Sequence, residues 1–483
     1  MSKPHLQRIA SRVATASNAA RAANRQSRER TSTAETADNP VRNLASTPNL
    51  YDVDSGPPRT IAVDLTRLLP GGVSGGVKVV SIELVRQLAK QAPDWKFLIL
   101  TSEKSHEELS VVRRSNVHRV CLDSANHGGS TQARRKWLLP TESFRELLRH
   151  RRLAFARSLA WRFLWQPRRL RLLEDEQVDA LLLPLTVPTF YAQGVPTVAV
   201  IYDLQHVDHP EFFRVDEQTA RNRHLAALSK SAAKLICISN HARDTVLRCL
   251  HVSPERAVTI PFGLRSEFLT KGRVDAVATL RKHGLQERGF WLYPANSWPH
   301  KNHLRLFEAF AEYRRHGRST VKLVCCGADT GRHDVLRRAI AEQNLEGVVR
   351  LIGYVPKGDL LDLMASCRGV VFPSLYEGFG MPVLEAMAGG VPVACSNVTS
   401  LPEVVGDAAV RFDPSRTESI TAALEKLNDP DIATKLATAG RERAANFDTV
   451  GMMARRYLNV LDGVCQRNLS MTAAGIHPTA SHR

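Results

Sequence analysis

The sequence predicts an α/β protein of two Rossmann-like, doubly wound domains that face a central cleft. Its 483 residues exceed what a single core usually holds. Compact apolar runs that end in polar residues alternate with helical patterns, and this alternation stops near residue 265 and restarts near residue 287. Alternating strands and helices indicate parallel sheets covered by helices, and such sheets bind ligands at the carboxyl ends of their strands.

The first domain is predicted over residues 58–265. Before it, residues 1–57 are rich in Ala, Ser and Arg without apolar periodicity, which favours a disordered basic tail over a transit peptide. A glycine-rich loop at 70–78 separates the first strand from a helix at 79–91. The predicted strands are 59–65, 96–102, 178–185, 196–204, 233–239 and 257–264.

The second domain is predicted over residues 287–445, after a polar linker at 266–286. Its predicted strands are 289–295, 321–327, 348–354, 369–374 and 391–396. Its predicted helices are 302–315, 334–344, 357–367 and 382–390. A helix over 446–465 is expected to pack back on the N-terminal domain, and residues 466–483 are expected to form a disordered tail.

The composition is that of a soluble globular protein with a formal net charge of +18. The sequence has no uninterrupted apolar run of about twenty residues. It also lacks an apolar signal segment at the N-terminus, so a cytoplasmic protein is expected. The eight cysteines show no metal-binding spacing, which predicts buried thiols and no metal site.

The basic segment 134–171 mixes Arg with Trp, Phe and Leu at rough helical spacing. Such a pattern suits a helix lying on an anionic membrane surface, at the inner face of the cell membrane. It equally suits an ordinary amphipathic helix with its aromatic side chains in the core. Both alternatives stay open. No nucleic-acid motif accompanies the positive charge, so no nucleic-acid partner is expected.

The stretch 376–385, YEGFGMPVLE, holds two carboxylates around a glycine-rich loop. Gly378 and Gly380 come just before a predicted helix, where free backbone N–H groups and the helix dipole favour an anion. Glu377 and Glu385 flank that position. Carboxylates there stay ionised and accept hydrogen bonds from hydroxyls. The simpler interpretation is a helix start with Glu placed to suit the dipole.

The run 370–414, VVFPSLYEGFGMPVLEAMAGGVPVACSNVTSLPEVVGDAAVRFDP, closely resembles the donor-binding block of family 4 retaining glycosyltransferases, which have the GT-B fold. Glu377 and Glu385 meet the family signature E-x7-E. The resemblance runs from about Ile61 to Leu461. It implies that Glu385 holds the ribose hydroxyls of a nucleotide sugar and that Glu377 contacts the transferred sugar. The backbone that would contact sugar hydroxyls or phosphates belongs to Gly378, Phe379, Gly380 and Met381.

The segment 293–303, YPANSWPHKNH, resembles the family segment that follows the first strand of the second domain. Lys301 matches the lysine that neutralises the diphosphate as negative charge develops on the leaving group. A lysine at a helix start in water is the alternative. The family often has an additional arginine about six residues earlier. Here that region holds Ala295 and Asn296, and we count Asn296 among the donor-binding candidates.

In the first domain, the glycine-rich loop occupies the place of the family loop that closes over the diphosphate. This implies an anion contact at Gly75 and Gly76, with a plain turn as the alternative. Further on, CISNHARD (237–244) resembles the family segment with a serine followed by a basic residue. Ser239 and Arg243 are therefore expected to line the cleft.

At the end of the strand 196–204 the family usually has His-Asp, and this chain has Tyr202 and Asp203. Asp203 remains a candidate catalytic residue. A tyrosine is a poor acid or base at neutral pH, so the family histidine's role in orienting the sugar is in doubt. Either His206 or His209 takes that role, or both are surface residues.

The resemblance implies transfer of a hexose from a nucleoside-diphosphate sugar to a hydroxyl of a glycan or lipid-linked acceptor, with retention at the anomeric carbon. The leaving phosphate would take the acceptor's proton, so no protein base and no metal are obligatory. The nucleotide sugar is then a co-substrate, and no cofactor is expected. Similarity to mannosyl- and rhamnosyl-type transferases of surface polysaccharide assembly makes GDP-mannose the leading donor.

Two other classes stay open. A non-catalytic GT-B scaffold that binds a nucleotide sugar or an anionic membrane is favoured by Tyr202 and by the absent arginine. A glycoside hydrolase also uses two carboxylates. It has no need, however, to place them around a glycine loop at a helix N-terminus beside a lysine.

Overall fold

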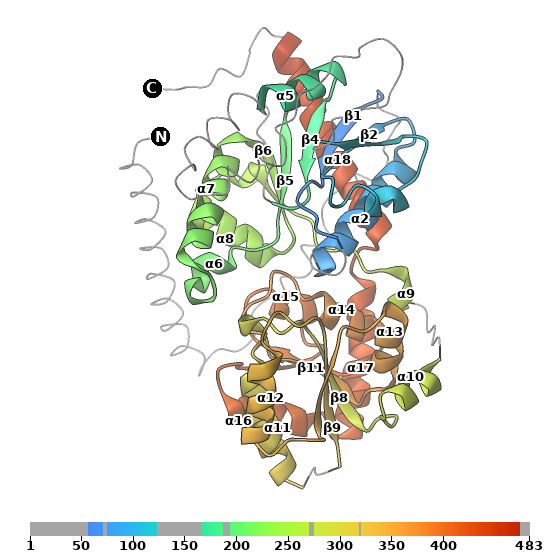
Figure 1. Cartoon of the computed structure of the whole chain (residues 1–483), viewed down its shortest axis with the longest axis vertical. Coiled ribbons are helices and arrows are strands. Elements are labelled where there is room, and N and C mark those ends of the chain that lie inside the picture. Colours follow the sequence, from blue (N-terminus) through green and yellow to red (C-terminus); the bar gives the residue numbers. More distant parts are fainter. Residues whose placement is uncertain are drawn as a thin grey trace, which may run out of the picture.

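The computed structural model describes residues 57–70, 75–122, 166–186, 194–269, 275–317 and 320–473. Two α/β domains are stacked along the long axis of the molecule (Figure 1). The predicted basic tail up to residue 56, most of the basic segment 134–171 and residues 474–483 lie outside the described residues. The described chain resumes at Gly75, which is the first residue of a helix.

The N-terminal domain is built on a seven-stranded parallel sheet of order β3-β2-β1-β4-β5-β6-β7. Short, mostly buried apolar runs form these strands, as in β5, where all residues are buried. The chain moves outward from β1 in one direction and from β4 in the other, so the sheet's topological switch point lies between β1 and β4. The strands are β1 (Thr60–Asp64), β2 (Lys96–Thr101), β3 (Val117–Cys121), β4 (Ala180–Leu183), β5 (Thr197–Ile201), β6 (Ala232–Cys237) and β7 (Ala257–Thr259).

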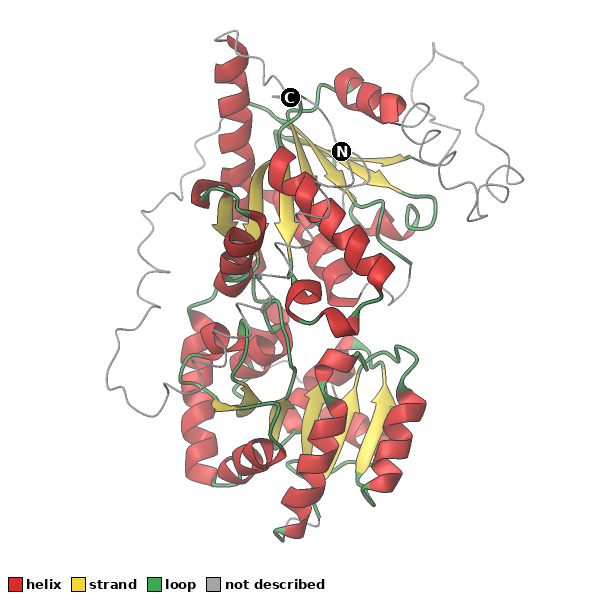
Figure 2. Cartoon of the chain, turned by 90° about the vertical axis from the view of Figure 1, so that its left-hand side faces the viewer, coloured by secondary structure: helices red, strands yellow, loops and turns green. Residues whose placement is uncertain are grey.

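The C-terminal domain has a six-stranded parallel sheet of order β10-β9-β8-β11-β12-β13, with its switch point between β8 and β11. Figure 2 shows both sheets covered by helices. The strands are β8 (Phe290–Pro294), β9 (Lys322–Cys326), β10 (Val349–Gly353), β11 (Gly369–Phe372), β12 (Val393–Ser396) and β13 (Val410–Phe412).

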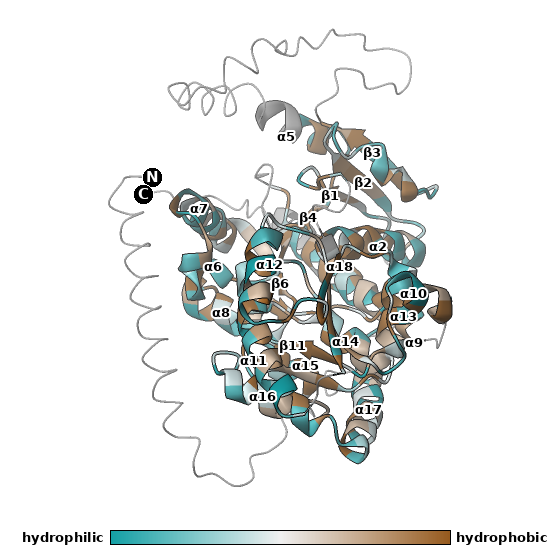
Figure 3. Cartoon of the chain, turned by 60° about the horizontal axis from the view of Figure 1, so that its bottom comes forward, coloured by the Kyte–Doolittle hydropathy of each residue, from teal (hydrophilic) through white to brown (hydrophobic). Residues whose placement is uncertain are grey.

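The helices turn apolar faces to the sheets and polar faces to solvent, which Figure 3 shows as brown strands between teal-edged helices. In the N-terminal domain they are α2 (Gly75–Gln91), α5 (Gln166–Asp175), α6 (Gln205–Asp208), α7 (Val215–Ser231) and α8 (Asn240–Leu250), with η2 (Glu108–Val111), η5 (Pro210–Phe212) and η6 (Pro254–Arg256). In the remainder they are α9 (Ser266–Leu269), α10 (Ala276–Lys282), η7 (Pro299–Lys301), α11 (His303–Arg315), α12 (His333–Glu342), α13 (Lys357–Ser366), α14 (Met381–Ala388), α15 (Leu401–Val405), α16 (Thr417–Lys426), α17 (Pro430–Ala445) and α18 (Val450–Ala473).

The chain crosses between the domains twice. The first crossing is the segment between β7 and α9 (residues 260–265), and the second is the segment between α17 and α18 (residues 446–449). The two crossings lie side by side. Leu264 on the first crossing forms a parallel bridge with Thr449 on the second. The backbone N–H of Leu264 donates to the carbonyl of Asp448 at 2.8 Å. A Cβ on Gly263 would lie 2.5 Å from the Cα of Val450, so only glycine permits this approach. The paired crossings form a narrow connection between the two domains.

Helix α18 returns from the second crossing to the N-terminal domain, where it packs against α2, β4 and β6. The buried guanidinium of Arg59 is paired with Asp462 of this helix at 3.0 Å. The side chain of Gln91 donates to the carbonyl of Gly451. The C-terminal segment therefore completes the N-terminal domain and fixes the second crossing at that end.

Three predicted boundaries differ from the structure. Helix α2 begins at Gly75, inside the predicted loop 70–78, so Gly75 and Gly76 belong to its first turn. Residues 266–286, predicted as a linker, carry α9 and α10. Helix α10 packs on α13 of the C-terminal domain because the buried Thr279 hydroxyl donates to Asp362 at 2.8 Å. Helix α18 continues to Ala473, past the predicted end at 465, since no glycine or proline interrupts its last turns. In the described part of the chain, no helix is long and apolar enough to cross a membrane.

Candidate active site

The carboxyl ends of the two sheets face each other. A Cβ on Gly378, in the loop after β11, would lie 2.4 Å from the backbone oxygen of Tyr202, which follows β5. The loops after β8 and β11, on either side of the switch point of the C-terminal sheet, carry Lys301 and Glu377. Open α/β sheets bind ligands at such a point. The motifs that contain Lys301 and Glu377 thus lie at the switch point, where a fold of this kind binds its ligand.

Lys301 and Glu377 form an ion pair. The Nζ of Lys301 donates to Oε1 of Glu377 at 2.6 Å, and the two side chains are 16% and 11% exposed. The ammonium also lies 5.5 Å from the centre of the Phe372 ring, on the face of β11. Backbone contacts join the two loops, because the N–H of Leu375 donates to the carbonyl of His300 at 2.8 Å. The pair places one cation and one acceptor together in a half-buried position.

The loop between β11 and α14 has a conformation that requires glycine. Gly380 has φ of 106°, a left-handed conformation in which a side chain is strained. A Cβ there would also lie 2.6 Å from Leu401. The buried hydroxyl of Ser400 bonds the carbonyls of Glu377 and Phe379 at 2.9 and 3.0 Å. These contacts therefore hold the backbone before the first turn of α14 in one conformation.

The side chain of Phe379 is not available to a ligand, and that of Met381 is partly exposed. The Phe379 ring is buried against Phe262 of the first crossing and Phe447 of the second, with ring centroids 5.6 and 6.0 Å apart. Met381 is partly buried against the core of the domain. At Phe379 a ligand could reach only the backbone, and the Phe379 ring links the loop to both crossings.

Glu385 lies in α14 and is 4% exposed. Its Oε1 accepts hydrogen bonds from Nη2 and Nε of Arg265 at 2.5 and 3.2 Å. Burial raises the pKa of the Glu385 carboxyl above its ordinary value, and the adjacent Arg265 guanidinium opposes that rise. Arg265 belongs to the first crossing and was not predicted as a site residue.

Tyr202 and Asp203 end β5, across from the glycine loop. Burial raises the pKa of the Tyr202 hydroxyl far above its ordinary value, with Ser81 as its hydrogen-bond partner, and its ring packs on Phe262. Tyr202 therefore cannot replace a titrating histidine. Asp203 Oδ1 accepts from the backbone N–H of Gln205 at 3.0 Å, in the turn that precedes α6.

The two neighbouring histidines have different surroundings. His206 is buried, and its Nε2 lies 3.1 Å from Asn222 Oδ1. Burial, followed by the charge of Arg221, lowers the pKa of His206 to about 4. His209 packs edge-on against Tyr376, the residue before Glu377, with centroids 5.8 Å apart. Of the two, His209 is the histidine that touches the loop after β11.

Ser239 and Arg243 flank the first turn of α8. The Ser239 hydroxyl caps the helix by accepting from the N–H of Ala242 at 3.0 Å. Arg243 donates to the carbonyls of Ala257 and Pro254, so its guanidinium ties α8 to the segment before β7. A further side chain at the N-terminus of α8 is that of Glu403, which belongs to α15 of the C-terminal domain. Glu403 accepts from the backbone N–H groups at 240 and 241 at 3.0 and 3.1 Å.

The remaining predicted residues lie at the rim of the cleft. Asn296 Oδ1 accepts from the N–H of Ala328 at 2.8 Å and joins the loops after β8 and β9. Gly75 and Gly76 form the first turn of α2 after β1, and among the described residues no atom lies within 4 Å of a Cβ built on Gly76. The open space at Gly76 leaves its backbone approachable.

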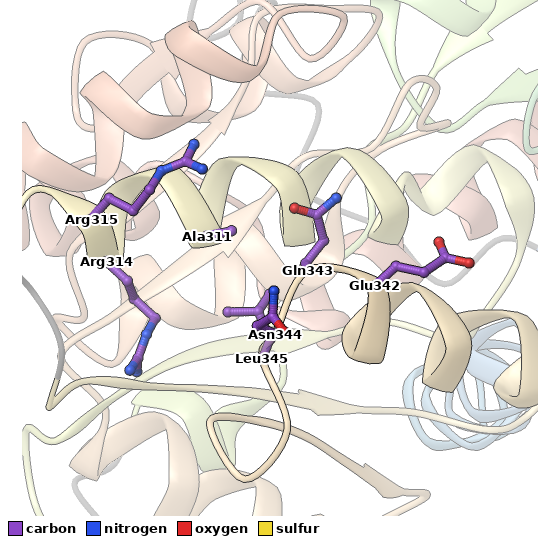
Figure 4. A pocket seen from close by; sticks show the side chains of 7 residues that line it. All are labelled: Ala311, Arg314, Arg315, Glu342, Gln343, Asn344 and Leu345. Atoms are coloured by element: carbon purple, nitrogen blue, oxygen red, sulfur yellow. The ribbon is translucent and has the colours of Figure 1, made fainter.

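Within the described ranges, no group of three or more His, Cys, Asp and Glu side chains is placed to hold a metal ion. A separate hollow of about 480 Å³ lies on the C-terminal domain (Figure 4). Its lining comes from the carboxyl ends of α11 and α12, which mark the amino-terminal edge of the sheet, opposite the cleft. The lining residues are Ala311, Arg314, Arg315, Glu342, Gln343, Asn344 and Leu345.

The structure thus brings Lys301, Glu377, Gly378 and Gly380 together, and it places Glu385 one helical turn further, beneath the interdomain crossing. The Arg243 guanidinium bonds the carbonyls of Pro254 and Ala257, and the Phe379 ring packs on Phe262 and Phe447, so neither side chain belongs to this group. Arg265 and Glu403 were not predicted as site residues, although Glu403 lies in the run 370–414 that carries the family resemblance.

Two family models match the chain. The model described as Glycosyltransferase Family 4 matches residues 74–268, and the model described as Glycosyl transferases group 1 matches residues 279–443. Together they take in well over half of the chain. The chain therefore belongs to the family 4, group 1 glycosyltransferases, and the predicted GT-B fold of two facing α/β domains is confirmed.

Curated relatives match over part of their length. The O-antigen chain mannosyltransferase B of Escherichia coli is 34% identical over 251 residues, which are 52% of this chain and 66% of that protein. The MMP alpha-(1->4)-mannosyltransferase of Mycolicibacterium hassiacum is 28% identical over 227 residues, 45% of this chain and 51% of that protein. The chain spans less than two thirds of the length of each.

Solved structures resemble the chain over most of its length. Anabaena HepE in complex with UDP and glucose aligns with a TM-score of 0.63 at 16% identity, covering 84% of this chain and 100% of that chain. WaaG, a glycosyltransferase involved in lipopolysaccharide biosynthesis, aligns with a TM-score of 0.60 at 16% identity, covering 83% and 100%. At these identities the likeness shows the fold alone.

Proposed function

We propose that the chain is a retaining glycosyltransferase that moves a hexose from a nucleoside-diphosphate sugar to a hydroxyl of a glycan or lipid-linked acceptor. The observation that carries the proposal is the Lys301–Glu377 pair at the switch point of the C-terminal sheet, beside the glycine-shaped start of α14. A cation, backbone donors and a carboxylate acceptor meet there. These are the groups that a diphosphate joined to a sugar requires.

In this proposal the donor lies along the loop after β11 and into α14. The Lys301 ammonium neutralises the diphosphate, and the backbone from Gly378 to Met381, at the start of α14, adds donors. Glu377 accepts from hydroxyls of the transferred sugar, and Glu385 accepts from the ribose. The domain contacts through Gly378 and Glu403 bring the acceptor domain over the donor, excluding water from the reacting atoms.

The chemical step is a front-face displacement. The acceptor oxygen bonds to the anomeric carbon as the bond from that carbon to the donor's phosphate oxygen breaks, and the acceptor proton passes to the leaving phosphate. The positive charge at Lys301 stabilises the nucleoside diphosphate as it forms. Asp203 accepts from the backbone N–H of Gln205, and we assign it to holding the loop after β5 in place rather than to proton transfer.

The donor is proposed to be GDP-mannose. Support comes from the names of the relatives, since the Escherichia coli and Mycolicibacterium hassiacum proteins are mannosyltransferases and one of them acts in O-antigen chain synthesis. HepE was solved with UDP and glucose, so a UDP-sugar is the competing donor. Surface polysaccharide synthesis is the proposed setting.

Contact of residues 134–171 with an anionic surface on the cytoplasmic side of the membrane is part of the same proposal. It would bring the acceptor domain to a lipid-linked substrate. Flotation with liposomes of anionic lipid should carry the wild-type chain upward and leave behind a variant in which the arginines of 134–171 are replaced. Equal flotation of both proteins would remove this part of the proposal.

A glycoside hydrolase is disfavoured by the ion pairs of the two carboxylates. Glu377 is paired with Lys301 and Glu385 with Arg265, whereas a glycosidase needs one carboxyl as a proton donor. A non-catalytic donor-binding scaffold would share the geometry and differ only in turnover.

A thermal-shift screen of GDP-, UDP- and dTDP-sugars tests class and donor together. The proposal predicts that GDP-mannose raises the melting temperature and that mannose alone does not. The absence of a shift with every nucleotide sugar would overturn it. Release of nucleoside diphosphate from the stabilising donor then separates the enzyme from the scaffold.

A further inference from the structure

Arg265 joins two features that are otherwise separate, the interdomain crossing and the carboxylate of Glu385. Its backbone directly follows Leu264, which pairs with the second crossing through Thr449. Its side chain reaches across 120 sequence positions to Glu385 in α14. The guanidinium is 20% exposed, and the carboxylate that it meets is 5% exposed. Little water reaches this ion pair, so solvent screens the attraction between its two charges only weakly.

Arg265 contacts one of the two oxygens of the Glu385 carboxylate. Nη2 and Nε of Arg265 lie 2.5 and 3.2 Å from the same oxygen, Oε1 of Glu385. Both hydrogen bonds of this carboxylate in the described part of the chain end on that oxygen. A carboxylate held by one oxygen keeps the other, Oε2, available to accept hydrogen bonds from hydroxyl groups.

Arg265 is itself held in place. Its Cζ lies 4.8 Å from the centre of the Phe268 ring, and its carbonyl accepts from the N–H of Phe268 at 3.1 Å. The preceding residues are fixed to the second crossing, since the N–H of Gly263 lies 3.2 Å from the sulfur of Met453. The guanidinium position therefore follows the position of the paired crossings.

We propose that Arg265 is a positioning residue of the donor site, which fixes Oε1 of Glu385 so that Oε2 receives the ribose hydroxyls and which couples that site to the hinge between the domains. The inference rests on the proposed function, because Glu385 must be the ribose acceptor. A rotation of the crossings that withdrew Arg265 would leave the buried Glu385 carboxylate unpaired, and donor binding would weaken. Donor affinity and domain arrangement are then linked through one ion pair.

Three charged groups act on Glu385 from the elements around it. They are Arg265 on the crossing, Glu267 on α9 and Lys357 on α13, and the last two are paired with each other. Burial raises the pKa of Glu385, and Arg265 is the main charge that lowers it. Removing Arg265 should therefore leave Glu385 protonated over more of the neutral range. A protonated carboxyl accepts ribose hydrogen bonds poorly, so affinity should fall as the pH falls.

The test is titration calorimetry of GDP and of UDP into the full-length chain between pH 6.0 and 8.5, for wild type, Arg265→Met and Arg265→Lys. The control is Arg411→Met, which breaks a surface arginine–carboxylate pair with Asp407 at the edge strand β13. We expect Arg265→Met to raise the Kd about tenfold or more at pH 6.5 and to recover to within about threefold of wild type at pH 8.5. Arg265→Lys should restore part of the affinity, and the control should bind as wild type.

The double variant Arg265→Met/Glu385→Gln supplies the decisive comparison, because Gln cannot titrate. Its affinity should be weak and should lose the pH dependence seen in Arg265→Met alone. An Arg265→Met protein with wild-type affinity at every pH, or with a loss of the same factor at every pH, would overturn the proposal. If the wild-type chain binds neither GDP nor UDP, the proposed function itself fails, and that outcome is visible before any variant is compared.

Discussion

The Nζ of Lys301 lies 2.6 Å from Oε1 of Glu377, and this pair bridges the two loops that flank the switch point of the C-terminal sheet. The lysine comes from the loop after β8 and the glutamate from the loop after β11. The position is half-buried, so each charge depends on the other for compensation. A donor diphosphate would enter next to a cation already fixed by a carboxylate, with little reordering of the lysine.

Replacing Lys301 by Met should reduce release of nucleoside diphosphate from the donor sugar by about 10²–10³-fold, because the leaving group loses its fixed cation. The variant keeps the aliphatic stem that packs over Phe372. Lys96→Met, which breaks a surface pair with Glu176 on the N-terminal domain, is the control and should retain wild-type release. A Lys301→Met protein that releases product at the wild-type rate would show that the lysine does not act on the diphosphate.

Replacing Gly378 by Ala should lower turnover at least about tenfold while leaving the fold intact. The new methyl group would lie 2.4 Å from the Tyr202 carbonyl oxygen, so the two domains could not approach as closely. Gly463→Ala is the control, because a Cβ in this part of α18 meets only the Arg467 side chain at 4.0 Å. It should raise the free energy of unfolding by about 0.5–1 kcal/mol without changing turnover. Equal turnover in both variants would contradict the close domain contact.

Replacing Glu403 by Ala should loosen the contact between the domains. The carboxylate caps α8 through the backbone N–H groups of Asn240 and His241, and loss of such a cap costs about 0.5–2 kcal/mol. We expect a larger radius of gyration in X-ray scattering with donor present and a donor Kd raised several-fold. Glu418→Ala, an exposed position in α16, should change neither quantity. Identical scattering from wild type and Glu403→Ala would refute the interdomain cap.

The stability of the chain should decrease as the pH falls below about 6.5. Burial is the main cause that lowers the pKa of His206 to about 4 and of His300 and His303 to about 3. These groups stay neutral in the folded state and bind protons in the unfolded state. Each therefore costs about 1.4 kcal/mol of unfolding free energy per pH unit from about pH 6.5 down to its folded pKa.

Urea titrations at several pH values between 7.5 and 5 measure this effect. The curve of His303→Gln should be shallower than that of wild type by about 1.4 kcal/mol per pH unit. The exposed Val277, replaced by Ala, is the control without a titrating group and should follow the wild-type slope. Parallel curves for wild type and His303→Gln would show that this histidine is protonated equally in both states.

Much of the fold could be predicted because the central strands are short, continuous apolar runs. Several of the elements that were missed have weaker patterns, although helix α8, also missed, has a clear buried face. In the edge strand β3 only Cys121 is buried, and β13 has just three residues, so neither forms a compact apolar run. Helix α7 buries only Leu225 and Leu228 along its length, which leaves little helical periodicity in the sequence.

The candidate site could be predicted only where chemistry and local sequence coincide. Glu377 and Glu385 lie in one loop and in the helix that follows it. Their spacing in the sequence therefore indicates how far apart they lie in the structure. Arg265 and Glu403 act through contacts that span 120 and more than 160 sequence positions. Such contacts depend on how the two domains dock, and an isolated arginine after a strand has no pattern that indicates a distant partner.

The central claim is that the loop after β11 and helix α14 bind the nucleotide part of a sugar donor, with Glu385 on the ribose. Titration calorimetry of GDP, with UDP in parallel, into wild type, Glu385→Ala and the remote exposed control Glu425→Ala tests it most directly. We predict binding to wild type and to the control, and a Kd at least about tenfold higher for Glu385→Ala, since hydrogen bonds to a charged acceptor are lost. Unchanged affinity in folded Glu385→Ala would contradict the claim.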